Sequence, residues 1–420
     1  MRIEQLGDLG TAAEVLRALG DATARRDLPP PAALTGDWFG SRAVIAPSVT
    51  VEPVGPAEVF SQLNATPHNL PPDAPPGTVA GGWIGYLSYP DGGADGRGHR
   101  IPEAAGGWTD CVLRQDGDMW WFESLSGAAM PGWLTDALAT RAPLRSCRIY
   151  WRAPDRRVHR AGVLACLEAI RAGEVYQACV CTRFTGIVTG DPLDFFADAA
   201  SRTVPARGAY LAGSWGAVAS LSPELFLRRR GTVVDSSPIK GTLPLDARPS
   251  ALLASAKDVA ENIMIVDLVR NDLGRVALTG TVTVPELLSV QPAPGVWHLV
   301  STVSAQVPEQ LSMPTLLDAT FPPASVTGTP KHRARQLLSQ WEPHHRGIYC
   351  GTVGLASPVA GVELNVAIRT VEFDAAGGAV LGVGGGITAD SDVDAEWQEC
   401  LHKAASIVAV DQSRQRSTAS

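Results

Sequence analysis

The chain has 420 residues, 45% of them hydrophobic, so it can bury a large core. With a net charge of −8 and no block of Lys or Arg, it is unlike proteins that bind nucleic acid or an anionic membrane. No apolar run reaches the length of a membrane span, and the first residues lack a signal-peptide layout, so we expect a cytoplasmic protein. The seven cysteines are sparse and form no CxxC pair, which indicates reduced thiols such as Cys179 and Cys181 in the core.

The first 150 residues are rich in Pro and Gly, and two aromatic segments at 81–90 and 118–124 predict strands. Residues 91–98 read as a polar, Gly-rich loop. We expect residues 1–150 to form an N-terminal part intertwined with the rest, 151–410 to form the catalytic region, and 411–420 to be a disordered tail.

From residue 155 onward the hydrophobic pattern becomes more regular. Residues 156–173 predict a helix whose apolar positions are Val163, Leu164, Leu167 and Ile170. A strand pair is expected around 180–187 and 211–227. Residues 255–274 predict an amphipathic helix with a buried stripe of Ile263, Ile265, Val266, Leu268 and Val269.

The C-terminal part adds β-prone segments and one more helix. Strands are predicted at 351–356, 364–371 and 379–383, and a helix at 392–410. Strands that follow one another like hairpins, with helices between them, indicate an α+β protein with antiparallel sheets rather than a Rossmann array.

Two glycine-rich stretches resemble nucleotide-binding loops but fail the spacing. Residues 382–387 lack the final Gly of GxGxxG, and residues 327–331 lack the GxxxxGK[ST] spacing of a P-loop. What remains is backbone whose N–H groups can approach a ligand oxygen closely.

Two acidic pairs at helical spacing could bind a metal ion. Asp258 and Glu261 are three residues apart, as are Glu396 and Glu399, so each helix offers two carboxylates on one face. Two such helices facing each other would suit Mg²⁺. Solvated helix faces are the alternative, although Glu261 lies close to an apolar stripe.

Glu224 and Lys240 flank a predicted strand–turn–strand segment and could act as a proton donor and an amine nucleophile. A capping Glu and a turn Lys are the structural alternatives. His298, Tyr349 and Arg369 are likewise compatible with plain core or strand positions, although a buried Arg369 would need an anionic partner.

Read in order, these segments resemble the chorismate-utilizing enzyme family, which includes anthranilate, aminodeoxychorismate, isochorismate and salicylate synthases. The match is dense from about 170 to 405. The similar stretches are AGEVYQ (172–177), SLSPELFL (220–227), SSPIKGTLP (236–244), KDVAENIMIVDLVRNDLGRV (257–276), HLVSTV (298–303), FPPASVTGTPKHRA (321–334), RGIYCGTVG (346–354), NVAIRT (365–370) and GVGGGITADSDVDAEWQE (382–399).

The resemblance implies a chorismate-binding fold, in which two large, mainly antiparallel β-sheets pack together with helices on the outside. It implies Mg²⁺ as cofactor, held by Glu261 and Glu399 directly and by Asp258 and Glu396 through water. It implies Glu224 as the acid and Lys240 as the nucleophile. The substrate-binding residues that it implies are Tyr349, Arg369, Gly384, Gly385, Gly386, Thr327, Gly328, His298 and Lys403.

Within the family, the PIKGT motif around Lys240 is typical of the aminodeoxychorismate synthases, the large components of para-aminobenzoate synthase. Isochorismate and salicylate synthases carry a water-activating lysine that we align with Ala178. The resemblance therefore implies amination of chorismate at C4 by ammonia, by way of a Lys240 adduct. No glutaminase segment is recognisable, so ammonia would come from solution or from a glutamine amidotransferase subunit.

Other activities remain open at this stage. Anthranilate synthase, 2-amino-2-deoxyisochorismate synthase and isochorismate synthase are sister functions, which Lys240 and Ala178 disfavour. A non-catalytic partner subunit is the alternative from a different class, suggested by departures from the family pattern at Leu243, Val259 and Ala324. Retention of the four helix carboxylates together with Glu224 and Lys240 argues against it.

Overall fold

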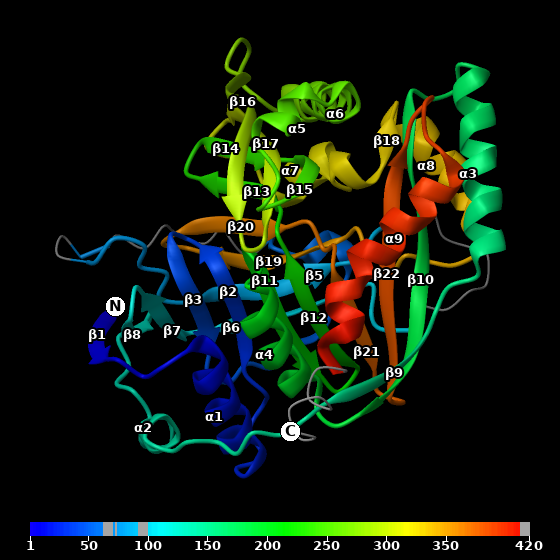
Figure 1. Cartoon of the computed structure of the whole chain (residues 1–420). Helices are drawn as coiled ribbons and strands as arrows, with labels where there is room; N and C mark the ends of the chain where they lie inside the picture. The colour runs from blue at the N-terminus through cyan, green and yellow to red at the C-terminus, as the bar shows by residue number, and fades with distance from the viewer. Residues whose placement is uncertain (62–69, 72–73, 91–99, 412–420) are drawn as a thin grey trace.

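The computed structural model describes residues 1–61, 70–71, 74–90 and 100–411, and two β-sheets form its centre (Figure 1). The loop expected at 91–98 and all but the first residue of the tail expected at 411–420 lie outside the described residues. None of the described helices is long and apolar enough to cross a membrane.

The first sheet has twelve strands in the described part of the chain, all paired antiparallel. In spatial order they are β1 (Arg2–Gly7), β8 (Met119–Ser124), β7 (Cys111–Asp116), β3 (Ser41–Ala46), β2 (Ala32–Trp38), β11 (Arg207–Gly213), β12 (Gly216–Ser222), β21 (Thr370–Asp374), β22 (Gly378–Ile387), β10 (Gln177–Thr189) and β18 (Gly328–Thr329), with β9 (Arg148–Arg152) on the far end of β10.

The second sheet has ten strands in the same described residues and is also antiparallel. Its order is β15 (Ile239–Pro244), β17 (Val296–Gln306), β14 (Val233–Ser237), β13 (Leu225–Arg230), β20 (Gly361–Asn365), β19 (Thr352–Ser357), β5 (Gly82–Leu87), β6 (Ala104–Thr109) and β4 (Glu52–Pro53), with β16 (Thr283–Ala293) paired to β17.

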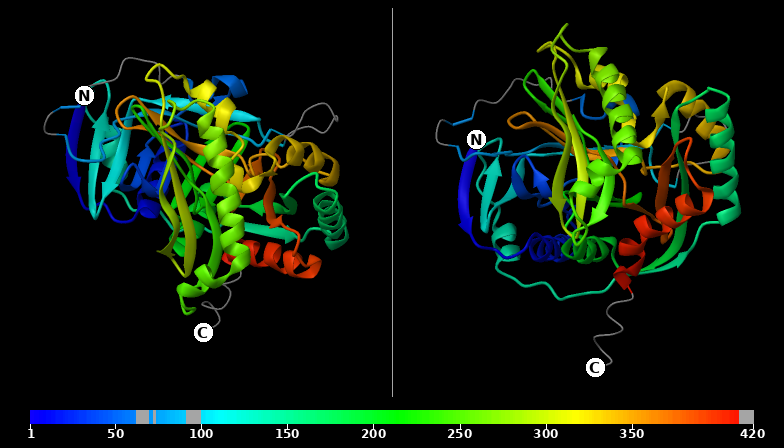
Figure 2. Two further views of the ribbon diagram at one scale, coloured as in Figure 1. Left: turned by 90° about the horizontal axis from the view of Figure 1, so that it is seen from above. Right: turned by 45° about the horizontal axis from the view of Figure 1, so that its top comes forward.

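Helices cover the outer faces of the two sheets (Figures 1 and 2). They are α1 (Ala12–Ala24), α2 (Gly132–Leu138), α3 (Arg156–Arg171), α4 (Pro192–Thr203), α5 (Ser250–Ala254), α6 (Ala256–Gly274), α7 (Met313–Thr320), α8 (Lys331–Trp341) and α9 (Val393–Val408), with short 3₁₀ turns at Pro56–Glu58, Ala324–Val326 and Ala409–Asp411.

Besides a smaller core of α3 and α8 on β10, three apolar cores of the described residues follow from this layering. One lies between the sheets and joins residues such as Leu34 and Ile84. A second packs α1, α2, α4 and α9 on the first sheet, and a third packs α6 and α7 on the second. The predicted α+β class with two packed antiparallel sheets is confirmed. Strands from the first 150 residues contribute to both sheets.

The helices that carry the two acidic pairs, α6 and α9, lie close to their predicted bounds. The Ser255 hydroxyl accepts a hydrogen bond from the Asp258 amide and begins α6, and the Asp392 carboxylate begins α9 in the same way. One predicted core position was wrong, because Ile263 is 46% exposed; Leu164, an apolar position of α3, is 44% exposed as well. A period of 3.6 residues allows a stripe to drift, and each side chain lies at the edge of the buried face.

Two strand predictions also need correction. Residues 211–227 are not one partner of 180–187: they form parts of β11, β12 and β13, and β10 pairs with β22 instead. The predicted strand at 364–371 is broken, since β20 ends at Asn365 and β21 begins at Thr370. Arg369 lies in the break with φ of 52° and is not a strand residue.

A buried carboxylate fastens the two sheets together. Glu363 on β20 is fully buried, and its oxygens accept hydrogen bonds from Arg207 of the first sheet at 2.6 Å and from the Phe39 amide at 2.9 Å. Arg228 of the second sheet adds a bond of 2.9 Å, and Arg230 lies 3.4 Å away. One side chain thus holds groups from both sheets.

We predict that Glu363→Gln destabilises the protein by about 3–5 kcal/mol, because it removes the buried counter-charge of the arginines and leaves Arg207 only the exposed Asp37. Urea unfolding gives the free energy directly. Glu4→Gln, which removes a largely exposed partner of Arg2, should change it by less than about 1 kcal/mol. Equal losses in the two variants would contradict the role assigned to Glu363.

Candidate active site

Most of the predicted site residues gather where the end of β22 meets α6, α9 and β15. In Figure 1, β22 and α9 lie side by side, across from the part of the molecule that holds α5, α6 and β14–β17. An alanine Cβ at Gly386 would lie 3.1 Å from Lys240 Nζ and 3.5 Å from Glu261 Oε2. The Lys240 ammonium and the Glu261 carboxylate are 3.8 Å apart. Three residues predicted from separate motifs are therefore neighbours.

The backbone of β22 is open to a ligand at two of its three consecutive glycines. Cys179 and Cys181, which face Gly386 and Gly384, donate their amides to Thr327 and Glu342 on the other edge of β10. Antiparallel pairs alternate between hydrogen-bonded and open, so the amides of Gly384 and Gly386 point away from β10. By the same alternation, Gly385 belongs to the ladder with Val180.

Lysines neutralise the buried carboxylates of α6 and α9. Lys257 Nζ lies 3.1 Å from Glu396 and 3.9 Å from Glu261. Although burial opposes it, the Glu396 carboxylate raises the pKa of Lys257. Burial raises the pKa of Glu261, against the pull of Lys240 and Lys257. The buried carboxylates of Glu261 and Glu396 are thus stabilised by a neighbouring positive charge.

Lys403 acts in the same way one turn further along α9. Its Nζ lies 2.7 Å from Glu399 and donates to the Gly384 carbonyl at 2.9 Å. Despite burial, Lys403 lowers the pKa of Glu399. Lys403 therefore occupies the open edge of β22 beside the candidate substrate amides.

Glu224 supplies a carboxylic acid close to Lys240. Burial raises the pKa of Glu224 to about 7, opposed by the Ser325 hydroxyl and the charge of Lys240. The Ile239 amide donates to Glu224 Oε1 at 3.4 Å. A carboxyl group with this pKa can hold a proton near neutral pH and release it in a reaction.

Arg369 and His298 lie next to this acid. Burial lowers the pKa of the Arg369 guanidinium, and the nearby Glu224 charge opposes the effect. Burial, with help from Arg369, lowers the pKa of His298 to about 4, so the imidazole is neutral at pH 7. Its Nδ1 shares a hydrogen bond of 2.9 Å with Thr242, on the strand that carries Lys240. Arg369 is thus a buried cation close to Glu224 that could bind a substrate carboxylate.

Asp258, Tyr349, Thr327 and Gly328 contact the strands that form the site. Asp258 packs against Gly241, and the Tyr349 ring covers Gly382, where a Cβ would lie 2.1 Å from it. The Thr327 hydroxyl donates to the Ala324 carbonyl at 3.1 Å, and Gly328 pairs with the outer edge of β10. Each of the four residues therefore contacts one of the strands β10, β15 and β22.

The structure corrects the position assigned to the water-activating lysine. Ala178 faces the core formed with α3 and α8, so a side chain there would point away from Lys240. The neighbouring Gln177 faces the site, 3.7 Å from the Cβ position of Gly386, and its buried Oε1 has no hydrogen-bond partner. Sequence reasoning missed Gln177, which the alternation of strand faces could have identified. An amide cannot act as a base, so the site still lacks that lysine.

The carboxylates fit a hard cation such as Mg²⁺. A Cβ at Gly385 would lie 3.0 Å from Glu396 Oε2 and 3.8 Å from Glu399 Oε1, and Glu396 Oε2 is buried without a hydrogen-bond partner. No group of three or more His, Cys, Asp or Glu among the described residues is arranged to hold an ion by itself. Mg²⁺ commonly takes one or two carboxylates and completes its shell with water and substrate oxygens. Glu396, Glu399 and Glu261 would supply the protein part.

Comparison with known proteins identifies relatives of the whole site region. Residues 50–409 match the family described as chorismate binding enzyme. Aminodeoxychorismate synthase component 1 of Salmonella typhimurium is 37% identical over 364 residues, 82% of this chain and 79% of the relative. The Escherichia coli protein of that name is 43% identical over 244 residues, 56% of this chain, and the match spans about half (53%) of its length. Anthranilate synthase component I from Streptococcus pneumoniae has a similar structure, with a TM-score of 0.72, 24% identity and 90% of each chain covered.

The raised pKa of Glu224 predicts a pH-dependent cost in stability. The folded pKa is about 7 and the unfolded value about 4.5, so the folded protein binds more protons between these values. Stability therefore falls as pH rises from about 4.5 to 7. Glu224→Gln should remove this fall and gain roughly 2–3 kcal/mol at pH 8 relative to pH 5, compared with the unchanged protein.

Urea unfolding across this pH range measures the effect. Glu372, whose pKa burial also raises to about 7, remains in both proteins and cancels in the difference. Glu52→Gln, at an exposed position of β4, is the control and should leave the pH profile unchanged. Parallel profiles for Glu224→Gln and the unchanged protein would show that Glu224 is ionised at neutral pH.

Proposed function

This chain belongs to the chorismate-binding enzyme family, and from that premise we propose that it aminates chorismate at C4 to give 4-amino-4-deoxychorismate. The observation that carries the proposal is the position of Lys240 Nζ, beside the open β22 edge at Gly386 and near the buried acid Glu224. The relatives named aminodeoxychorismate synthase component 1 support the same reading.

In the proposed reaction, Lys240 and Glu224 act together. The free Lys240 amine forms a bond to C2 of chorismate while the C4–O bond breaks, and Glu224 gives its proton to the hydroxyl, which leaves as water. Ammonia then bonds to C4, and the C2–Nζ bond breaks to regenerate the lysine. Arg369 and the amides of Gly384 and Gly386 hold the enolpyruvyl carboxylate.

Magnesium and a partner complete the proposal. Bound Mg²⁺ would hold the ring carboxylate and offset its charge, with Glu261 and Glu399 as ligands. Lys257 lies 3.9 Å from Glu261 and Lys403 lies 2.7 Å from Glu399, so these lysines also neutralise the two glutamates. The name component 1 in the relatives fits a second subunit, and we propose a glutamine amidotransferase that supplies ammonia.

Product analysis tests the function. We expect the pure protein, with chorismate, Mg²⁺ and an ammonium salt at mildly alkaline pH, to form a product that keeps the enolpyruvyl group and carries NH₂ at C4. Mass spectrometry identifies it. Lys240→Ala should abolish the product because the nucleophile is gone, and Glu224→Gln should slow its formation about 10²–10⁴-fold.

A matched control variant and the identity of the product distinguish this activity from its alternatives. Glu286→Gln, at an exposed position on β16, should retain full activity. Anthranilate with released pyruvate, or isochorismate, would assign the chain to a sister activity. Full activity in Lys240→Ala would overturn the adduct, and no Mg²⁺-dependent product from ammonium would overturn the amination.

The ion pair of Lys257 yields a prediction that does not depend on turnover. Because its ammonium lies among the proposed metal ligands, replacing it by the neutral Lys257→Met should strengthen Mg²⁺ binding about tenfold. Isothermal titration calorimetry measures the affinity. Arg270→Met, which removes an exposed cation from the same helix, should leave it unchanged. Equal or weaker binding by Lys257→Met would contradict competition between lysine and metal.

A further inference from the structure

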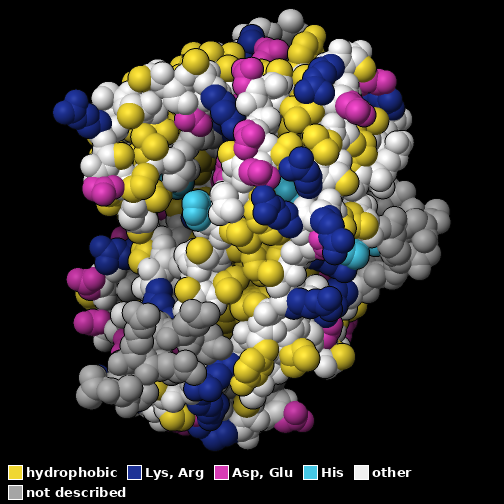
Figure 3. All heavy atoms as spheres, turned by 45° about the vertical axis from the view of Figure 1, so that its right-hand side comes forward, with side chains coloured by type: hydrophobic (Ala, Val, Ile, Leu, Met, Phe, Trp, Pro, Cys, Tyr) yellow, Lys and Arg dark blue, Asp and Glu magenta, His cyan; other side chains and the backbone are white. Residues whose placement is uncertain are grey.

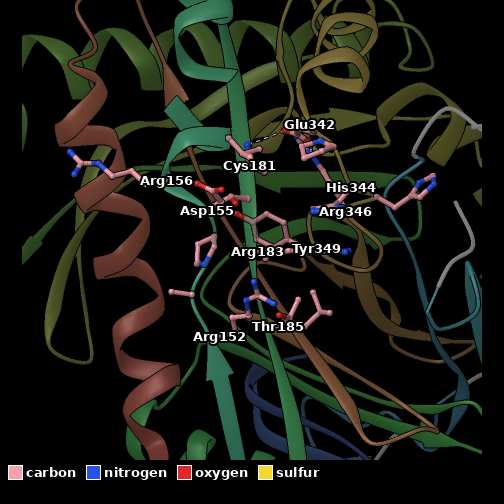
Figure 4. Close-up of a pocket in the computed structure, with 18 of the residues that line it drawn as sticks. Arg152, Asp155, Arg156, Cys181, Arg183, Thr185, Glu342, His344, Arg346 and Tyr349 are labelled. Atoms are coloured by element: carbon pink, nitrogen blue, oxygen red, sulfur yellow. Dashed lines mark hydrogen bonds and ion pairs between the residues drawn. The ribbon is translucent and has the colours of Figure 1, made fainter. Parts of the chain in front are cut away.

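A second cavity, of about 580 Å³, lies on the edge of β10 (Figure 4). Its lining comes from the end of β9, the first turn of α3, the middle of β10, residues 342–349 and β22. Figure 4 shows Tyr349 and Arg183 at this cavity, while Arg156 turns away toward α9. The cavity contains none of the carboxylates or lysines of the candidate active site.

The cavity exists because β10 lacks a strand neighbour over part of its edge. Among the described residues, β18 pairs with β10 at Gln177 and Ala178, and β9 pairs with it from Thr185 onward. Between them, Glu342 accepts a hydrogen bond from the Cys181 amide at 2.9 Å, and Arg346 donates to the Cys179 carbonyl at 2.7 Å. Side chains thus replace a strand here and leave a hollow outside them.

The cavity is strongly cationic although the chain is acidic. Four arginines and two histidines line it besides Arg156, which pairs with Asp394 outside the cavity; the acids of the lining are Asp155 and Glu342, and the whole chain carries −8. Both acids are already engaged: Glu342 pairs with Arg346 at 2.7 Å, and Asp155 caps the first turn of α3. On the face shown in Figure 3, Lys and Arg side chains gather in a band. Cations in a cavity concentrate anions there.

Arg152 is the cation best placed to bind a ligand. Arg152 is the last residue of β9. It lines the cavity and forms no ion pair with any described residue. The first turn of α3 also contributes to the lining, and a helix N-terminus favours negative charge. The rest of the wall includes the Tyr349 ring and Gly382, so the cavity can hold a small organic molecule and not only an ion.

The cavity is separate from the Lys240 end of β22. Gly382 in its wall faces Arg183, whereas Gly386 beside Lys240 faces Cys179. Four residues of strand correspond to about 13 Å. A ligand in the cavity would therefore not contact the amine.

We propose that this cavity is a second anion site, which binds a small organic acid or phosphate compound with two negative charges. The charge excess, the volume and the uncompensated Arg152 carry the inference. Carboxylate and phosphate share the chemistry that arginine recognises, so the test includes one probe of each kind.

Calorimetric titration of the full chain at low salt, with malonate in one series and inorganic phosphate in another, tests the proposal. We expect saturable binding of at least one probe, weakened at least about tenfold by Arg152→Glu. Arg160→Glu is the matched control, because it places the same charge change on α3 outside the cavity lining, and it should shift the affinity less than about twofold. Binding of malonate alone or phosphate alone would define the ligand class.

Three results would overturn the proposal. The first is no saturable binding of either probe. The second is equal weakening by Arg152→Glu and Arg160→Glu, which would indicate a general surface effect. The third is stoichiometric displacement of the probe by chorismate together with loss of binding in Arg369→Gln, which would place the anion in the chorismate site.

Discussion

The candidate site depends on the need to neutralise buried carboxylates. Glu261 and Glu396 are more than nine-tenths buried, and an ionised carboxylate without a partner in such a place costs several kcal/mol. Lys240 reaches Glu261 from β15, and Lys257 reaches both glutamates from α6. The Lys240 pair joins β15 of the second sheet to α6, and the Lys257–Glu396 pair joins α6 to α9. The Lys240–Glu261 ion pair therefore both neutralises a buried carboxylate and positions the proposed nucleophile.

Glycine on β22 is the second requirement of this arrangement. A side chain at Gly382 would collide with Tyr349, and one at Gly384 would lie 2.6 Å from Cys181 Sγ. At Gly386 it would lie 3.1 Å from Lys240 Nζ and fill the space beside the amine. Bare backbone on this edge leaves room for a ligand and presents two amides to it. The glycine run is thus explained by close approach, without any nucleotide-binding loop.

Sequence patterns predicted the elements better than the faces those elements present. Helical apolar periodicity and the i, i+3 acids were enough to place α6 and α9, because these signals are local. Local signals do not show which face of β10 points toward the Lys240 amine. Gln177 faces the site and Ala178 faces the core with α8, and this difference depends on how β10 packs in the folded protein. The break that contains Arg369 was also hidden, since its β-prone residues suit an ordinary strand. Its positive φ arises from tertiary packing, which propensity does not register.

The two ligand sites share the β10–β22 pair, and distance limits how they can influence each other. At about 13 Å along a strand, charges exposed to water are largely screened at physiological salt, where the Debye length is about 8 Å. A Coulombic effect of an anion at Arg152 on the Lys240 end is therefore small. Contact is a different route, since Tyr349 and Gly382 belong to the cavity wall and Gly382 continues directly into Gly384 and Gly386. A ligand that moved the Tyr349 ring would shift the strand whose amides face the substrate, so coupling would act through packing rather than charge.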